Sequence, residues 1–187
     1  PHVSQDGNTV VYVGQENRQS PMGHLMLWGL KRQVMPWCSD SGGETEMGST
    51  MDVTLSDWAD QCHEQGGTVI IPHFSTLNGE TVALITTGRA EGIELIYLRE
   101  DSHESYYQML NCGYRLPILG GTDKMTGDVP VGMYRTYVQI PEDQGFNYDT
   151  WRKNVALGKT FLTSGPMIGI SVEGRGIGDE FNISGPG

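Results

Sequence analysis

The sequence predicts an α/β fold with a mostly parallel sheet, either curled or open. Apolar, β-branched runs at 68–73 and 92–98 have the composition of buried strands. Between such runs lie stretches whose apolar residues recur at helical spacing and which end at a glycine. Strand, helix and strand in this order indicate βα units.

The clearest predicted helix begins after Thr54, the expected N-cap. Asp57 stands three residues later, as in a capping box, and Gly66 ends the helix. The other expected elements are strands over 10–13, 115–120, 133–140, 160–163 and 168–172, a strand opening at His24, and helices over about 80–87, 101–112 and 151–157, the last of them capped by Asp149. The long segment 36–51 is either a surface loop or a lid over the strand ends.

Composition excludes several classes of protein. The 187 residues suffice for one domain with a real core. A formal net charge of −11 argues against nucleic acid as a partner, because binding a polyanion needs a basic surface. The sequence has no apolar run long enough to span a membrane. Its three cysteines lack metal-type spacing, and Cys62 and Cys112 are expected to be small buried side chains.

Four potential metal ligands stand where apolar runs begin or end. Glu16 follows the run at 10–13, His24 opens an apolar run, and His73 and Asp123 each close one. In parallel α/β barrels the chemistry lies at the carboxyl ends of the strands. Two imidazoles and two carboxylates that meet there suit zinc, manganese or iron. The alternative for each histidine is a structural role with its hydrogen bonds satisfied inside the protein.

Three charged residues are further candidates. Glu94 interrupts an apolar strand, so its carboxylate either belongs to a site or faces outward from an edge strand. Lys124 and Arg135 flank the loop of Asp123 and are candidates to hold an anionic group of a substrate. Solvated surface charge is the alternative for both.

An ordered series of short motifs resembles one family. The series comprises Gly14-Gln15-Glu16-Asn17-Arg18, Met22-Gly23-His24-Leu25, Pro72-His73, Gly92-Ile93-Glu94, the segment 110–115, Gly120-Gly121-Thr122-Asp123, Arg135-Thr136-Tyr137-Val138 and the closing segment 158–166. In this order the motifs resemble the CehA/McbA family of metallohydrolases, in the PHP (polymerase and histidinol phosphatase) superfamily. The resemblance covers about residues 10–172.

The resemblance implies a distorted (β/α)7-type barrel over residues 1–165, incomplete at its N-terminus, with extra β strands near the C-terminus. Residues 166–187 would then form a closing strand and the start of a β segment. The superfamily's opening His-x-His pair is absent, and methionine replaces the histidine of its late Asp-x-His motif, at Met125. An intact site of this kind holds two or three divalent ions. By this resemblance Glu16 bridges metals, while His24, His73 and Asp123 ligate them.

Two functional classes remain open from the sequence. The first is a metal-dependent hydrolase acting on a small-molecule ester, amide, carbamate or phosphoester, with Asp123, Arg135 and Lys124 as catalytic residues. The second is a non-catalytic binding or interaction module with a degenerate metal site. Metal content distinguishes them. The sequence indicates neither compartment nor oligomeric state.

Overall fold

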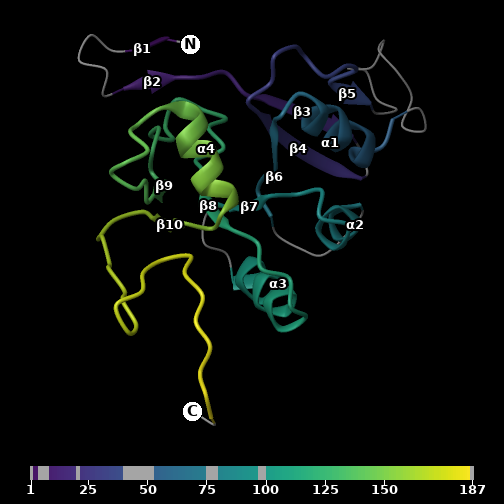
Figure 1. Cartoon of the computed structure of the whole chain (residues 1–187). Helices are drawn as coiled ribbons and strands as arrows, with labels where there is room; N and C mark the ends of the chain where they lie inside the picture. The colour runs from purple at the N-terminus through teal and green to yellow at the C-terminus, as the bar shows by residue number, and fades with distance from the viewer. Residues whose placement is uncertain are drawn as a thin grey trace.

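A six-stranded mixed sheet forms the centre of the fold (Figure 1). The computed structural model describes residues 2–3, 9–19, 22–39, 53–74, 80–96 and 100–185. The strands of the sheet, in spatial order, are β5 (Cys38–Ser39), β3 (Gln15–Gln19), β4 (Gly23–Trp28), β6 (Thr68–Ile71), β7 (Gly92–Leu95) and β8 (Ile118–Gly120). Two smaller antiparallel pairs accompany it: β1 (His2–Val3) with β2 (Val10–Val11), and β9 (Arg135–Val138) with β10 (Thr160–Thr163).

The sheet is rich in parallel pairs, as predicted, but one strand runs against its neighbours. The pairs β3–β5, β6–β7 and β7–β8 are parallel, whereas β4 is antiparallel to both β3 and β6. Only residues 20–22 lie between β3 and β4, and a parallel connection needs a dozen residues or more. The strand that opens at His24 is therefore an antiparallel member of a sheet that the sequence predicted to be mostly parallel.

Within the described residues, four helices flank the sheet: α1 (Leu55–Glu64), α2 (Thr81–Thr86), α3 (Glu100–Asn111) and α4 (Tyr148–Ala156). The predicted capping box of α1 is confirmed, because the Thr54 side chain accepts from the Asp57 backbone and the Asp57 carboxylate accepts from the Thr54 backbone. The predicted cap of α4 was wrong by two residues. Asn147 caps that helix by accepting from the Thr150 N–H at 2.9 Å, which places Asp149 in the first turn.

Two predicted strands differ from the structure. Val10 and Val11 form only a two-residue strand, and Val11 and Val13 are 56% and 91% exposed, so this run is not a buried strand of the main sheet. Residues 168–172 form no strand, and Val172 makes only an isolated bridge to Arg175. In Figure 1 the yellow C-terminal segment is drawn as irregular chain outside the six-stranded sheet.

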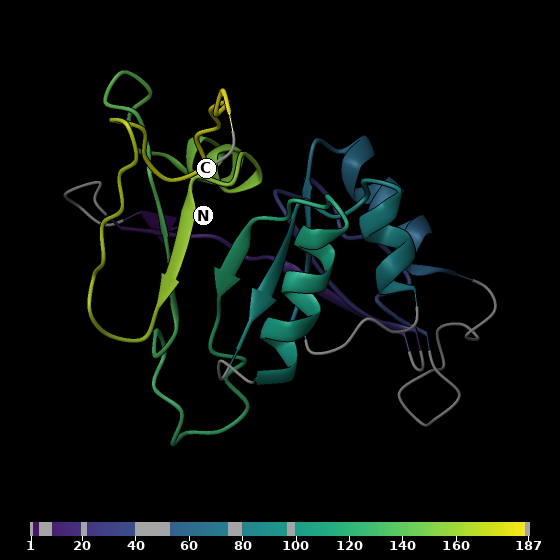
Figure 2. The ribbon, with the colours of Figure 1, turned by 90° about the horizontal axis from the view of Figure 1, so that it is seen from below.

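The sheet has two different faces. One face packs against α1, α2 and α3 in the main core, which contains alternate residues of β4, β6 and β7, such as Leu25 and Leu27 of β4. The opposite face carries a smaller cluster around Ile70, Leu119 and Val155, beneath α4 and β9. Figures 1 and 2 show the three helices grouped on one side and α4 with β9 and β10 on the other. Because side chains alternate along a strand, His24 lies on this second face.

A histidine of α1 is tied to the segment before β7. His63 Nε2 lies 2.8 Å from Glu91 Oε1, and the other carboxylate oxygen of Glu91 accepts from the Val69 N–H of β6 at 2.7 Å. This hydrogen bond raises the pKa of His63 above its ordinary value. His63 is thus a half-buried, paired side chain and not a freely solvated one.

This pairing predicts a pH dependence of stability. A folded-state pKa above the unfolded value stabilises the fold fully below the unfolded pKa, near 6.5. That contribution is lost as pH rises through the folded pKa. We expect the free energy of unfolding from urea melts to fall as pH rises above about 6.5 and through the raised pKa of His63. His63→Gln should fall less over this interval, and an equal fall in both proteins would contradict the assignment.

Two further expectations concern the burial of the cysteines and the absence of a membrane-spanning helix. Cys62 is buried as predicted and Cys38 is buried too, whereas Cys112 is exposed, because it follows the last turn of α3. Among the described residues, no helix combines the length and the apolar composition that a bilayer crossing requires.

Candidate metal centre

Two strands and one strand end bring three of the predicted ligands together. Glu16 of β3 lies opposite Met26 of β4 in the register, and His24 is two residues away on the same face. Diagonal neighbours of this kind are within reach of long side chains. Because β4 is antiparallel to β6, its first residues lie beside the end of β6, which His73 follows by two residues.

The three ligand atoms form a small triangle. His24 Nδ1 lies 2.9 Å from His73 Nε2 and 3.0 Å from Glu16 Oε1, and the third side, from His73 Nε2 to Glu16 Oε1, measures 3.8 Å. The point equidistant from these atoms is about 1.9 Å from each, close to the 2.0–2.2 Å of zinc–nitrogen and zinc–oxygen bonds. The donor set therefore fits one divalent ion with little movement.

The electrostatics of the triangle favour a charged carboxylate. Hydrogen bonds from His24 and His73 hold the pKa of the Glu16 carboxyl well below its usual range. The same contact with Glu16 raises the pKa of His73, and the negative charge of Asp123 adds to this effect. A divalent cation can bind between two imidazoles and an ionised carboxylate arranged in this way, in place of the protons that now link them.

Glu94 lies next to the triangle. Its strand, β7, has neighbours on both sides, which excludes the outward-facing edge position. Its side chain is buried, and Oε2 accepts from the backbone N–H of His73 at 3.0 Å. Burial raises the pKa of this carboxyl, while the His73 N–H opposes the shift. Glu94 thus holds the backbone of a candidate ligand and contributes negative charge to the site.

Asp123 lies outside the triangle, but its negative charge acts on residues of the site. It is not among the described groups whose ligand atoms lie within 4.8 Å of one another, yet its charge acts on both His73 and Glu94. His73 and Asp123 also share an uncommon backbone conformation, with φ of 35° and 40°. Residues other than glycine rarely adopt positive φ, and such strain gathers at functional sites. The metal-ligand role of Asp123 stays a prediction.

The two predicted catalytic cations lie in different settings. The Lys124 ammonium donates to the carbonyls of Thr126 and Val129, at 2.8 and 2.6 Å. These two hydrogen bonds stabilise the loop that carries Lys124. Arg135 opens β9 and is exposed, and it lines a cavity that Glu94 also lines. Their catalytic roles stay predictions. Most of the segment 36–51, either lid or loop, lies outside the described residues.

Glu94 needs a glycine beside it. A Cβ added at Gly121 would lie 1.5 Å from Glu94 Oε1 and 2.6 Å from its Cδ. We therefore expect Gly121→Ala to displace this carboxylate from the His73 N–H and to weaken Zn²⁺ binding roughly tenfold, the usual cost of losing a partner that orients a ligand. Competition with a chromophoric chelator measures the affinity. Gly127→Ala, where a Cβ meets open space, is the matched control, and equal affinities in both variants would contradict this role of Glu94.

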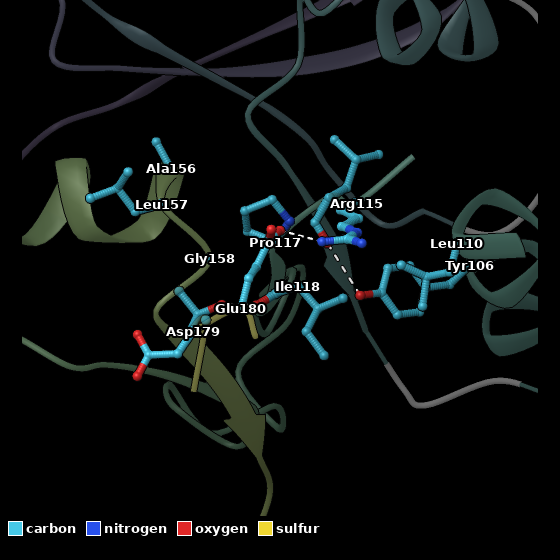
Figure 3. A pocket seen from close by; sticks show the side chains of 13 residues that line it. Tyr106, Leu110, Arg115, Pro117, Ile118, Ala156, Leu157, Gly158, Asp179 and Glu180 are labelled. Carbon is cyan, nitrogen blue, oxygen red and sulfur yellow. Dashed lines mark hydrogen bonds and ion pairs between the residues drawn. The ribbon is translucent and has the colours of Figure 1, made fainter. Parts of the chain in front are cut away.

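A second cavity has a different character. It has a volume of about 420 Å³ and lies between α3, the end of α4 and the C-terminal segment (Figure 3). Arg115 and Glu180 form an ion pair at its surface, and the Tyr106 hydroxyl donates to the Leu116 carbonyl. No described group of three potential metal ligands lies there, so the triangle of Glu16, His24 and His73 is the stronger candidate site.

Sequence reasoning named the three side chains that the structure brings together, but it missed part of their surroundings. Glu94 was recognised as unusual without a definite role, and its burial within an apolar strand was the signal. Trp28 and Trp151, which line the cavity beside Glu94, were not recognised as site residues. The alternation of His24, Met26 and Trp28 along one strand could have identified the first of them.

Comparison with known proteins supports the fold. No protein-family model and no curated protein matches the chain. Among solved structures, the chain is similar to a two-domain protein from Bacteroides vulgatus that contains a predicted PHP-like metal-dependent phosphoesterase. The TM-score is 0.53 with 17% sequence identity, over 80% of this chain and 43% of that protein. This chain therefore matches less than half of that protein's length, and the likeness shows a shared fold.

Proposed function

We propose that this chain carries the metal site of a metal-dependent hydrolase. The observation that carries the proposal is the triangle of Glu16, His24 and His73, whose centre fits a divalent ion. A divalent ion in such a site lowers the pKa of water toward 7 and polarises the bond to be cleaved. We propose zinc, manganese or iron, because the donors are imidazole and carboxylate groups.

Each residue of the proposed site has its own role in the reaction. Glu16, His24 and His73 hold the ion, and Glu94 fixes the backbone of His73 through its N–H. Asp123, whose charge already acts on His73, is the proposed further ligand and the group that orients the attacking water. Arg135 stabilises negative charge that develops on the substrate. Lys124 keeps the loop of Asp123 in shape through its two carbonyl contacts.

The proposed bond is a phosphoester. The structural neighbour is described as containing a predicted PHP-like metal-dependent phosphoesterase, and the similarity covers 80% of this chain. The motif series supports a finer proposal, a CehA/McbA-type member with a PHP-type barrel over residues 1–165 and a distinct segment over 166–187. By the same resemblance, the complete site holds two or three ions.

The experiment that tests this function compares metal-free and metal-loaded protein. The protein is stripped with a chelator and reloaded with Zn²⁺, Mn²⁺ or Fe²⁺, and hydrolysis of 4-nitrophenyl phosphate and 4-nitrophenyl acetate is followed. We expect cleavage of the phosphate ester that is lost with the chelator and restored by one of the ions. Acetate cleavage alone would move the assignment to carboxylic esters. A stable protein that binds no ion and cleaves neither probe would be a binding module, and the proposal would fail.

A further inference from the structure

A hollow on the second face of the sheet begins at Glu94. Its volume is about 390 Å³, within the range of small-molecule sites. Its lining comes from β4, β7, β8, β9 and α4, and the residues that the argument uses are Met26, Trp28, Glu94, Arg135 and Trp151. Because Glu94 also contacts His73, the hollow adjoins the candidate metal centre directly.

One wall of the hollow is apolar and aromatic. Met26 and Trp28 alternate with core residues of β4, so both side chains lie on the second face. The rings of Trp28 and Trp151 are 5.5 Å apart at their centroids and tilted by 40°. Both tryptophans and Met26 pack against the cluster of Ile70, Leu119 and Val155 beneath them, which supports them as a preformed wall. Such a wall favours a planar, apolar group, which can pack against the indole rings.

The hollow also contains a cation. Arg135 lines it and packs over Gly132, where an added Cβ would lie 3.7 Å from the arginine Cγ. In the part of the chain that the structure describes, no carboxylate forms an ion pair with Arg135, although the chain carries a formal net charge of −11. A guanidinium group can donate two parallel hydrogen bonds to two oxygens of a carboxylate, sulfonate or phosphate group.

We infer that this hollow is the substrate pocket of the proposed hydrolase and that it selects aromatic organic anions. The ring of the substrate lies against Met26, Trp28 and Trp151. Its anionic group, which contains the bond to be cleaved, contacts Arg135 and faces the end marked by Glu94. That the bound molecule is a substrate rests on the proposed function. The binding of an aromatic anion stands on the lining residues alone.

The test measures binding without catalysis. Naphthalene-2-sulfonate, which contains no bond of the proposed type, is titrated into metal-free protein and into Zn²⁺-loaded protein. The protein has four tryptophans, and their indole N–H signals in NMR spectra report on separate places. We expect the signals of Trp28 and Trp151 to shift, while those of exposed Trp37 and of Trp58 in the main core stay in place.

Two comparisons identify the contributions of ring and charge. Methanesulfonate, which keeps the anion and lacks the ring, should bind at least about tenfold more weakly. Arg135→Gln should weaken naphthalene-2-sulfonate binding by about tenfold or more, because a charge-assisted hydrogen bond is lost. Arg115→Gln, an exposed arginine at the other cavity, is the matched control and should bind as the parent does.

The outcomes separate this inference from the proposed function. Zn²⁺ binding at the triangle, without shifts at Trp28 and Trp151, would overturn the pocket and leave the hydrolase standing. Shifts at both tryptophans in a protein that binds no Zn²⁺ would support the pocket for aromatic anions and remove the hydrolase. Equal affinity of Arg135→Gln and the parent, or tighter binding of methanesulfonate, would overturn the inference.

Discussion

Replacing Asp123 with asparagine is expected to lower kcat/KM for a phosphoester substrate by about 100-fold or more, equivalent to about 2.7 kcal/mol of transition-state stabilisation. The substitution removes the charge that acts on His73 and Glu94 while keeping the side-chain volume. Asparagine also tolerates the positive φ of this position. The fold should therefore survive, and steady-state kinetics with thermal melts would show lost turnover with little change in Tm.

A matched control distinguishes the site from general charge. Asp143→Asn changes an exposed carboxylate in a surface turn in the same way and should keep parental turnover. If Asp123→Asn hydrolyses its substrate at the parental rate, Asp123 is neither a ligand nor a catalytic group.

Replacing His73 with alanine is expected to weaken binding of Zn²⁺ roughly 100-fold or more. The change removes one corner of the triangle directly, whereas loss of an outer partner alone costs about 10–100-fold. His24→Ala should behave in the same way, because His24 Nδ1 contacts both other corners. Calorimetric titration of stripped protein with Zn²⁺ gives the affinity and the number of ions.

His63→Ala is the control for loss of an imidazole. His63 of α1 pairs with Glu91 and belongs to no described group of three potential ligands. It should keep the parental Zn²⁺ affinity. Equal weakening in all three variants would show that metal binds elsewhere or only through a general loss of structure.

The helix ends could be predicted from the sequence because the residues that form them are close together in the chain. The capping box at Thr54 and Asp57, and the glycines after α1, α2 and α3, each act within one helical turn. The run at 10–13 misled because its β-branched residues indicate a strand without indicating a neighbour. Its pairing with His2–Val3 outside the main sheet depends on tertiary structure, as β propensity usually does.

The candidate site was predicted in part for a reason that the structure corrects. Glu16, His24 and His73 were expected to meet because each stands where an apolar run begins or ends, in a sheet predicted to be mostly parallel. They meet because β4 runs antiparallel, which brings its first residues to the end of β6. The direction of a strand depends on its connections and partners, and an apolar run alone carries neither. The position of Glu94 beside His73 likewise needed the β6–β7 register.

The most direct test of the metal centre is the anomalous scattering of crystals soaked in Zn²⁺. The account predicts a peak about 2.0–2.2 Å from Glu16 Oε1, His24 Nδ1 and His73 Nε2. A peak confined to other residues, or none at this triangle at saturating Zn²⁺, would contradict it.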